Sequence, residues 1–276
     1  MGRCFGVPDM PTIERDGATL YYEEHGTPGD GRPAVVFVHG SGGSALSWWQ
    51  QLPVFAVKHR VVAFDHRGFG RSTCAADALD PRCFAADLAA ILDAAHIERA
   101  ALVCQSMGGW TGLAFALAHP ERTAAIVLAG TPGGVATPAI QRDAAGVPQR
   151  MAERGFLGMA LARDFIRYDP MRSFLYERIG SLNPASTIPT VLPKLAGMRI
   201  EAAQLAAFRV PTLVLVGTDD AFFSVDGLRE VAAAIPGARF TVMQGAGHSA
   251  YFEQPERFNP LVEAFFEETG AWRTSS

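Results

Sequence analysis

The sequence predicts a doubly wound α/β fold in which a mostly parallel sheet is interrupted by an all-helical insertion. Five apolar runs are continuous rather than alternating, which is typical of strands buried on both faces of a parallel sheet. Helical patterns lie between these runs, and this alternation stops once, late in the chain. The runs are AVVFV (34–38), VVAF (61–64), AALVC (100–104), AAIVLA (124–129) and TLVLV (212–216).

The N-terminal part of the chain is expected to contain a β-hairpin, followed by alternating strands and helices. The segment from Thr19 to Glu24 is expected to be a strand, paired with TIER in a hairpin across the turn at Asp16-Gly17. After the early apolar runs, the stretches 83–97 and 110–121 each predict a helix with an apolar face. Strands and helices thus alternate as far as Gly130.

The alternation breaks between Gly130 and Arg209. This stretch is rich in Ala, Met, Phe and Arg and carries helical patterns such as MAERGFLGMALARDFIRY (151–168), without a clear buried strand. We expect residues 131–209 to form a helical cap over one edge of the sheet, and residues 1–130 and 210–276 to form the core domain. The alternative is a set of ordinary packing helices.

The composition excludes several classes of protein. A chain of 276 residues with 49% hydrophobic and 19% charged residues has enough apolar material for a large core. A net charge of -4 argues against nucleic acid, and no apolar run reaches the roughly 18 residues of a membrane helix. We expect a cytoplasmic protein with a small-molecule partner; the oligomeric state is not indicated. The cysteines form no C-x-x-C pair, so neither a zinc site nor a redox motif is predicted: Cys4, Cys74, Cys83 and Cys104.

The segment AVVFVHGSGGSA (34–45) permits two interpretations. A strand followed by Gly40-x-Gly42-x-x-Ala45 matches a dinucleotide-binding fingerprint, with Asp65 as the acid that would bind a ribose hydroxyl. The same strand followed by His39 and a glycine-rich turn is also how esterases build part of an oxyanion hole. The loop alone leaves both interpretations open.

Ser106 lies at a predicted sharp turn between a buried strand that ends at Cys104 and a helix that begins near Met107. Gly108 and Gly109 would let the two backbones pass closely, as a nucleophilic Ser at such a turn requires. The pattern G-x-S-x-G would have glycine where this chain has Cys104, which predicts a looser or more strained turn. A Ser that only caps the helix is the alternative, but a cap does not explain two glycines in a helix-forming stretch.

A nucleophilic Ser requires a base, and one of the seven histidines is well placed for that role. His248 lies in the loop GAGHSAYF (245–252), where neighbouring glycines free the backbone to aim the ring. A carboxylate that orients the imidazole is expected after TLVLV, where Asp219 and Asp220 both occur. Consecutive side chains tend to point in opposite directions, so only one of the two should face His248.

Together these segments resemble the α/β-hydrolase superfamily, in particular its small capped serine hydrolases. The resemblance rests on HGSGG (39–43), DHRGFGRS (65–72), CQSMGG (104–109), GTDD (217–220) and GAGHSAYFEQPERF (245–258), in that order. It implies a catalytic triad of Ser106, Asp220 and His248, with Asp220 favoured by the family spacing G-x-x-D. It also implies an oxyanion hole from the backbone N–H groups of Ser41 and Met107, and neither cofactor nor metal. Asp65 then belongs to a structural turn.

The resemblance further implies hydrolysis of a small to medium, largely apolar carboxylic ester or lactone through an acyl-enzyme. The SMGG stretch is also similar to hydrolases that cleave carbon–carbon bonds of aromatic ring-fission products, and cofactor-free peroxidase-like members are a third alternative. A non-catalytic small-molecule receptor is the alternative outside enzymes. Epoxide hydrolases and haloalkane dehalogenases of this fold need an Asp nucleophile, so Ser106 disfavours both. Apolar residues of the expected cap predict either an apolar pocket or the cap's own core: Phe156, Leu157, Met159, Phe165, Met171, Phe174, Leu175 and Tyr176.

Overall fold

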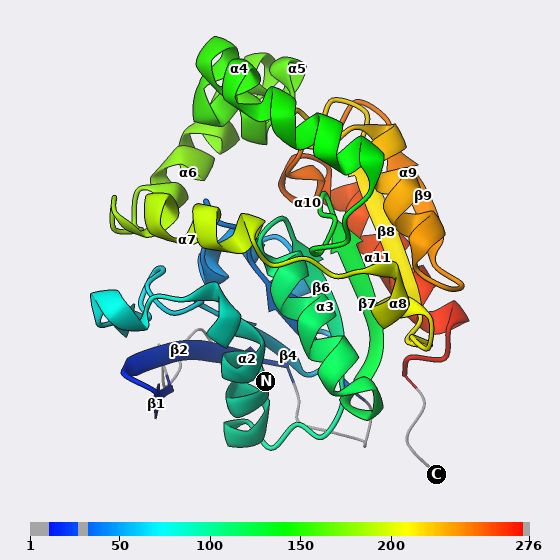
Figure 1. Ribbon diagram of the computed structural model, residues 1–276. Helices are drawn as coiled ribbons and strands as arrows, with labels where there is room; N and C mark the ends of the chain where they lie inside the picture. The colour runs from blue at the N-terminus through cyan, green and yellow to red at the C-terminus, as the bar shows by residue number, and fades with distance from the viewer. Residues whose placement is uncertain (1–10, 27–32, 273–276) are drawn as a thin grey trace.

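The computed structural model describes residues 11–26 and 33–272, and within them nine strands form one sheet (Figure 1). Its order is β1-β2-β4-β3-β6-β7-β8-β9, and β5 pairs with β2. The strands are β1 (Thr12–Arg15), β2 (Ala18–His25), β3 (Ala34–Val38), β4 (Val61–Phe64), β5 (Thr73–Cys74), β6 (Ala100–Gln105), β7 (Thr123–Ala129), β8 (Thr212–Gly217) and β9 (Arg239–Met243).

The sheet is antiparallel at one edge and parallel elsewhere. β1 and β2 form the expected hairpin, with Arg15 opposite Ala18 and positive φ angles at Asp16 (44°) and Gly17 (73°). From β4 to β9 all neighbouring strands are parallel. The predicted doubly wound, mostly parallel sheet is therefore confirmed. Because parallel strands end at the same edge, the loops after β3, β6, β8 and β9 can meet there.

Helices cover both faces of the sheet at its central strands, which is why β3, β4, β6, β7 and β8 are buried along their whole length and almost entirely apolar. In β3, Val36 belongs to one core cluster with Leu88 of α2, whereas Val35 belongs to the other with Phe258 of α11. This alternation is the two-residue period of a strand, with both faces buried. The helices are α1 (Leu52–Phe55), α2 (Phe84–Ala94), α3 (Gly108–Ala118), α4 (Pro138–Ala160), α5 (Arg163–Tyr168), α6 (Pro170–Gly180), α7 (Thr187–Ala196), α8 (Ala202–Leu205), α9 (Val225–Ala234), α10 (Ala250–Glu253) and α11 (Pro255–Glu268).

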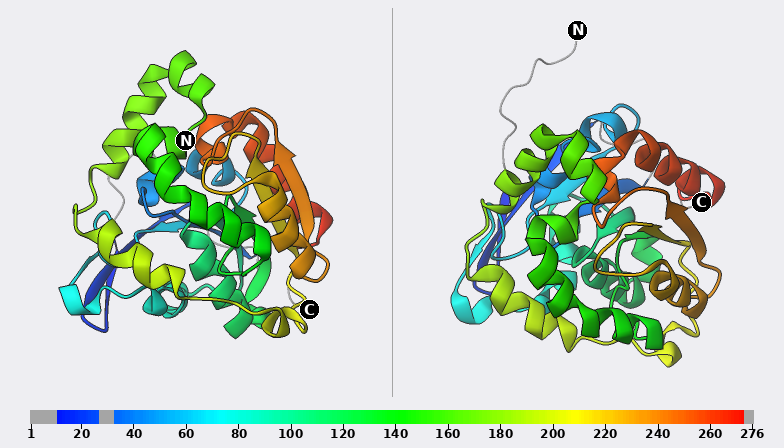
Figure 2. Two further views of the ribbon diagram at one scale, coloured as in Figure 1. Left: turned by 45° about the horizontal axis from the view of Figure 1, so that its top comes forward. Right: turned by 90° about the horizontal axis from the view of Figure 1, so that it is seen from above.

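The segment between β7 and β8 contains α4 to α8, and Figure 2 shows α4 to α7 gathered over one end of the sheet. Helix α4 begins after Thr137, whose hydroxyl accepts the Ile140 N–H (3.2 Å), and Pro138 occupies a first-turn position that needs no N–H donor. Gly155 (φ 66°, ψ 172°) interrupts the helical path of α4. The residues beyond Gly155 can therefore turn toward the sheet.

Cys4, one of the four cysteines considered above, lies outside the described residues. In the part of the chain that is described, no helix is long and apolar enough to cross a membrane.

Candidate active site

Ser106 occupies the turn between β6 and α3, with a φ of 48°. Positive φ is uncommon for a residue other than glycine and requires support from its surroundings. The Ser106 N–H donates to the Ala129 carbonyl (3.2 Å), and the Ser106 carbonyl accepts the Gly109 N–H (2.9 Å). The turn is thus tied to the neighbouring strand β7 and to its own helix.

The glycines that follow Ser106 allow very close packing. A Cβ on Gly108 would lie 2.3 Å from the Val38 carbonyl oxygen, and one on Gly109 would lie 2.3 Å from Thr131 Oγ1. Both distances are far below van der Waals contact. The two glycines therefore let α3 start directly against β3 and the end of β7.

Cys104 stands where the G-x-S-x-G pattern has glycine, and the structure accommodates it on the helix side. A Cβ on Gly112 would lie 2.2 Å from Cys104 Sγ, so glycine at 112 provides the space that the thiol fills. Burial raises the pKa of the Cys104 thiol, which is fully shielded from solvent. A buried neutral thiol is unsuited to act as a nucleophile in place of Ser106.

The glycine-rich turn after β3 packs directly on the Ser106 turn. A Cβ on Gly40 would lie 2.2 Å from Gln105 Oε1 and 2.9 Å from Ser106 Cβ. Ser41 and Met107 line the same cavity as Ser106. Within residues 11–26 and 33–272, the backbone N–H groups of Ser41 and Met107 donate to no protein acceptor. Both donors thus remain available to a ligand, as an oxyanion hole requires.

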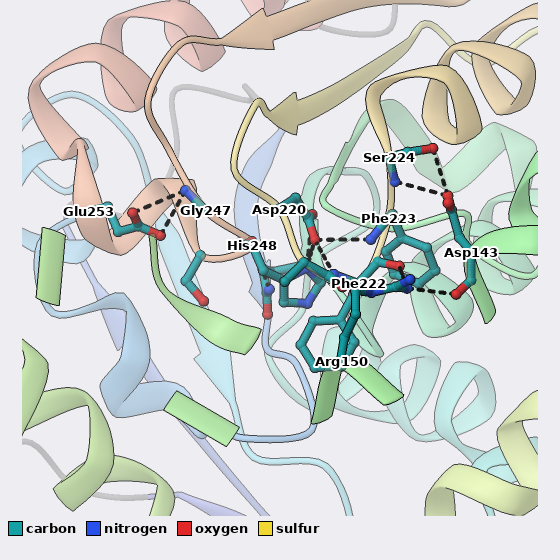
Figure 3. A network of polar contacts seen from close by, with 12 residues as sticks. Asp143, Arg150, Asp220, Phe222, Phe223, Ser224, Gly247, His248 and Glu253 are labelled. Atoms are coloured by element: carbon teal, nitrogen blue, oxygen red, sulfur yellow. Dashed lines mark hydrogen bonds and ion pairs between the residues drawn. The ribbon is translucent and has the colours of Figure 1, made fainter. Parts of the chain in front are cut away.

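The structure brings Asp220, rather than Asp219, next to His248 (Figure 3). His248 Nδ1 lies 3.0 Å from Asp220 Oδ2 and 3.2 Å from Oδ1, and both side chains are buried. Asp219 is exposed and accepts the Thr218 hydroxyl (3.3 Å). A carboxylate at Nδ1 favours the tautomer with its proton there, which leaves Nε2 free to accept a proton.

Ser106 and His248 line one cavity, so the fold brings the two loops that carry them close together. In the described part of the chain the Ser106 hydroxyl makes no hydrogen bond with His248. Such contacts often become short only when a substrate binds, so geometry without substrate does not exclude the pair. Gly130 lies close behind His248: a Cβ on it would be 2.9 Å from the His248 carbonyl oxygen.

A buried cluster of three polar side chains lies next to the glycine-rich turn after β3. His39 Nε2 accepts the His66 N–H (3.0 Å), and His66 Nε2 lies 2.9 Å from Thr111 Oγ1. Burial lowers the pKa of His39 to about 4 and lowers that of His66 as well. Both rings are therefore neutral near pH 7 and act as hydrogen-bonding core residues.

Asp65 is the residue that a dinucleotide site would use to bind ribose, but its carboxylate already accepts hydrogen bonds from backbone N–H groups. It is buried, and its two carboxylate oxygens accept the N–H groups of Ala45 (2.6 Å) and Arg71 (2.7 Å). Burial raises the pKa of Asp65 to about 6, opposed by these two hydrogen bonds. Asp65 thus ties the turn after β3 to the turn after β4, which is the structural role expected from the resemblance.

The cavity next to Ser106 has a volume of about 400 Å³ and a mostly apolar wall. Helices α4 and α7 contribute much of this wall, including Ile140, Val147, Met151 and Leu195. Among the described residues on the wall, Arg199 is the one Lys, Arg, Asp or Glu side chain. The expected apolar residues divide: Phe156 and Tyr176 line the cavity, whereas Met171 and Phe174 are exposed. Among the residues that the structure describes, no group of three or more His, Cys, Asp or Glu side chains could hold a metal ion.

Sequence reasoning missed several residues that contact the site. Gln105 packs on Gly40, and its Nε2 donates to the His248 carbonyl (3.4 Å); its place beside Ser106 was a usable signal. Glu253 binds the backbone of the loop before His248, and its position five residues later was a weaker signal. Asp143 and Arg150 contact the loop after Asp220, and no local pattern pointed to them.

The similarity of this chain to known proteins agrees with the geometry of the site. Residues 35–261 match the alpha/beta hydrolase family. A 2-hydroxy-6-oxononadienedioate/2-hydroxy-6-oxononatrienedioate hydrolase of Burkholderia vietnamiensis is 32% identical, covering 92% of this chain and 93% of its own. A Caulobacter protein that bears the provisional name carbamate hydrolase is 30% identical, covering 89% and 95%.

A solved structure described as an N-acyl homoserine lactone degrading enzyme superimposes with a TM-score of 0.77 at 27% identity. The match covers 92% of this chain and 100% of that one. Both sequence relatives are named as hydrolases, and the structural neighbour is described as a lactone-degrading enzyme. The sheet order, the family match over most of the chain and the full-length relatives therefore identify this chain as an enzyme of the alpha/beta hydrolase family.

Proposed function

We propose that the chain is a serine hydrolase in which Ser106 is the nucleophile, His248 the base and Asp220 the orienting acid. One observation carries the proposal most. Ser106, held at a positive φ between β6 and α3, shares a cavity with a His248 ring whose Nδ1 is paired with a buried carboxylate. A serine that only capped α3 would need neither the positive φ of Ser106 nor the nearby His248–Asp220 pair.

The chemistry follows from these positions. His248 Nε2 removes the Ser106 proton as Oγ attacks the substrate carbonyl, and Asp220 stabilises the imidazolium that forms. The negative charge on the substrate oxygen is stabilised by the N–H groups of Ser41 and Met107, the latter just before the N-terminus of α3. His248 then protonates the leaving group, and water attacks the acyl-enzyme in the same way.

The substrate we propose is a small to medium, largely apolar carboxylic ester or lactone. A cavity of about 400 Å³ is large enough for a compact acyl group, and its apolar wall favours hydrocarbon over charge. The lactone-degrading structural neighbour supports this choice. Residues 131–209 would then act as a cap, since α4 and α7 supply much of the wall.

A second candidate is a hydrolase of carbon–carbon bonds in ring-fission products. It is favoured by the 32% identical relative whose name specifies a dioate, a substrate with two carboxylates. Arg199 on the cavity wall could bind one such carboxylate, which an apolar ester would not need.

Covalent labelling tests the nucleophile, and a substrate panel separates the two candidates. The protein should react with a fluorophosphonate probe, and Ser106→Ala should remain folded, unlabelled and slower by several orders of magnitude. Labelling that persists in Ser106→Ala would remove Ser106 from the mechanism. Among p-nitrophenyl esters, lactones and ring-fission dienes, we expect esters or lactones to have the highest kcat/KM; a preference for dienes would favour the second candidate.

A further inference from the structure

Two loops carry the His248–Asp220 pair, and helix α4 or its end contacts both. The acid loop (residues 218–224) connects β8 to α9, and the histidine loop (residues 244–249) connects β9 to α10. Figure 3 shows the polar contacts that join these loops to the rest of the molecule.

Asp220 is held by the backbone of its own loop. Its Oδ1 accepts the N–H groups of Phe222 (2.8 Å) and Phe223 (3.0 Å). These two bonds define the orientation of the carboxylate only if the two peptide groups that donate them are themselves fixed. The carbonyl ends of those two peptide groups must therefore be held in place as well.

Arg150 of α4 binds those opposite ends. Its Nε–H donates to the Ala221 carbonyl (2.7 Å) and its Nη2 to the Phe222 carbonyl (3.4 Å). Because a peptide group is planar and trans, the Ala221 carbonyl and the Phe222 N–H belong to one rigid unit and point in opposite directions. The same holds for the next unit along the chain. One guanidinium thus holds the two peptide groups whose N–H ends bind Asp220.

Asp143, on the same face of α4, completes the clamp. Its Oδ2 accepts both the N–H and the hydroxyl of Ser224, each at 2.9 Å. Ser224 in turn accepts the Gly227 N–H at the start of α9 (3.0 Å). Arg150 also donates from Nη2 to the Asp143 carbonyl (2.6 Å), so the two residues brace one another.

Two glycines leave room for this clamp. A Cβ on Gly146, within α4, would lie 2.2 Å from Arg150 Nη1, and one on Gly227, within α9, would lie 2.3 Å from Asp143 Oδ2. Neither glycine has a positive φ, so backbone conformation does not require it. Glycine is unfavourable inside helices, and here it occurs where the clamp takes up the space of a side chain.

The far end of α4 reaches the histidine loop. The Ala160 carbonyl accepts the Ser249 N–H (3.0 Å), and Glu253 accepts the N–H groups of Gly247 (3.0 and 3.1 Å) and Ala162 (3.2 Å). The same helix also lines the cavity through Ile140 and Val147. One element therefore touches the substrate space and both loops that carry the pair.

We propose that Arg150 and Asp143 are positioning residues, which hold the acid loop from helix α4 and thereby orient the Asp220 carboxylate toward His248. This inference rests on the proposed triad. Neither side chain lines the cavity among the described residues, so their loss should affect the chemical step more than substrate binding.

The test measures kcat and KM of Arg150→Met, Arg150→Lys and Asp143→Asn in the full chain. We expect kcat of Arg150→Met to fall by about 10²-fold, as misplacement of a reacting group by an ångström can cause, while KM changes little. Arg150→Lys keeps one donor for the Ala221 carbonyl and should recover part of the loss. Arg154→Met removes an exposed arginine of the same helix and is the matched control.

Gly146→Ala provides a variant that keeps the arginine. The new Cβ should displace the Arg150 guanidinium while favouring the helix, so kcat should fall without loss of thermal stability. If Gly146→Ala and Arg150→Met both retain the kcat of the parent protein, the clamp has no positioning role.

A readout without turnover separates this proposal from the triad itself. The hydrogen-bonded His248 Nδ1 proton should give a low-field proton NMR signal, absent in Asp220→Asn and shifted or broadened in Arg150→Met. A signal lost in Asp220→Asn but unchanged in Arg150→Met would overturn the clamp and leave the triad intact. A signal unchanged in Asp220→Asn would count against the triad.

Discussion

The turn that carries Ser106 and the loops that carry Asp220 and His248 are held in different ways. Ser106 is fixed within the sheet layer: its N–H donates to β7, and the glycines after it pack against β3 and Thr131. The acid and histidine loops are instead fixed in part by α4 and its end, through Asp143, Arg150 and the Ala160 carbonyl.

The difference separates a fixed part of the site from an adjustable part. A Cβ on Gly108 would lie 2.3 Å from the Val38 carbonyl oxygen, so the backbone after Ser106 packs directly on β3 and has little room to move. The acid loop depends on a half-buried arginine of a helix that also lines the cavity. Substitutions in the insertion should therefore alter the alignment of the acid and base while Ser106 stays in place.

Asp220→Asn should cause the largest loss of kcat among substitutions in the acid loop and in α4. Asn cannot stabilise the imidazolium and favours the wrong His248 tautomer, which costs up to about 10⁴-fold in kcat for such a pair. Asp219→Asn, one residue away and exposed, is the matched control and should retain most activity. Steady-state kinetics on both variants gives the ranking. The reverse ranking would transfer the role to Asp219.

Glu253→Gln should change how the free energy of unfolding depends on pH, through the contact of Glu253 with the histidine loop. Burial raises the pKa of Glu253 from 4.5 to about 7, against the hydrogen bonds from Gly247 and Ala162. An acid whose pKa is raised by folding contributes stability that is complete below its unfolded pKa and is lost as pH rises through the folded value. Between pH 4.5 and 7 the parent protein should lose about 3 kcal/mol of unfolding free energy relative to Glu253→Gln.

Urea denaturation of both proteins at several pH values measures this difference. Titration of His39, His66 and Asp65 is common to the two proteins and cancels in the comparison. Glu256→Gln, at an exposed position of α11, controls for removal of one negative charge. A stability difference that does not change with pH would show that Glu253 is ionised throughout.

Gly108→Ala should test the rigidity of the Ser106 turn. The added Cβ meets the Val38 carbonyl oxygen at 2.3 Å, and a backbone atom in the central sheet cannot move aside cheaply. We expect a loss of about 1–3 kcal/mol in unfolding free energy, measured by chemical denaturation. Gly146→Ala meets only the end of a flexible side chain and should not destabilise the fold. Equal losses in both variants would remove the distinction between the two regions.

Val147→Ala should have the smallest effect, on substrate choice alone. Val147 lines the cavity from α4, and its shortening makes room for a longer acyl chain. Each methylene buried there is worth about 0.8 kcal/mol, or roughly fourfold in relative kcat/KM between neighbouring chain lengths. Val57→Ala, at an exposed valine away from the cavity, is the control. If Val147→Ala changes every ester by one factor, α4 does not select the chain length.

Local patterns were enough to predict the sheet and the segments that approach its edge. Continuous apolar runs predicted β3, β4, β6, β7 and β8, because strands buried on both faces have few polar positions. The glycines after Ser106 indicated the tight turn, since close backbone contact excludes a Cβ. These features involve neighbours in the chain, so the sequence by itself determined them.

Other features depended on residues that are far apart in the chain. The family spacing favours Asp220 over Asp219, but the contact of the Asp220 carboxylate with His248 depends on β8 and β9 lying side by side. Gly112 accommodates Cys104 across a strand–helix contact that no spacing rule described. The contacts of Arg150 with Ala221 and of Asp143 with Ser224 span 71 and 81 residues. Only the tertiary structure decided these, because a hydrogen bond between distant residues has no signature in the local order of residue types.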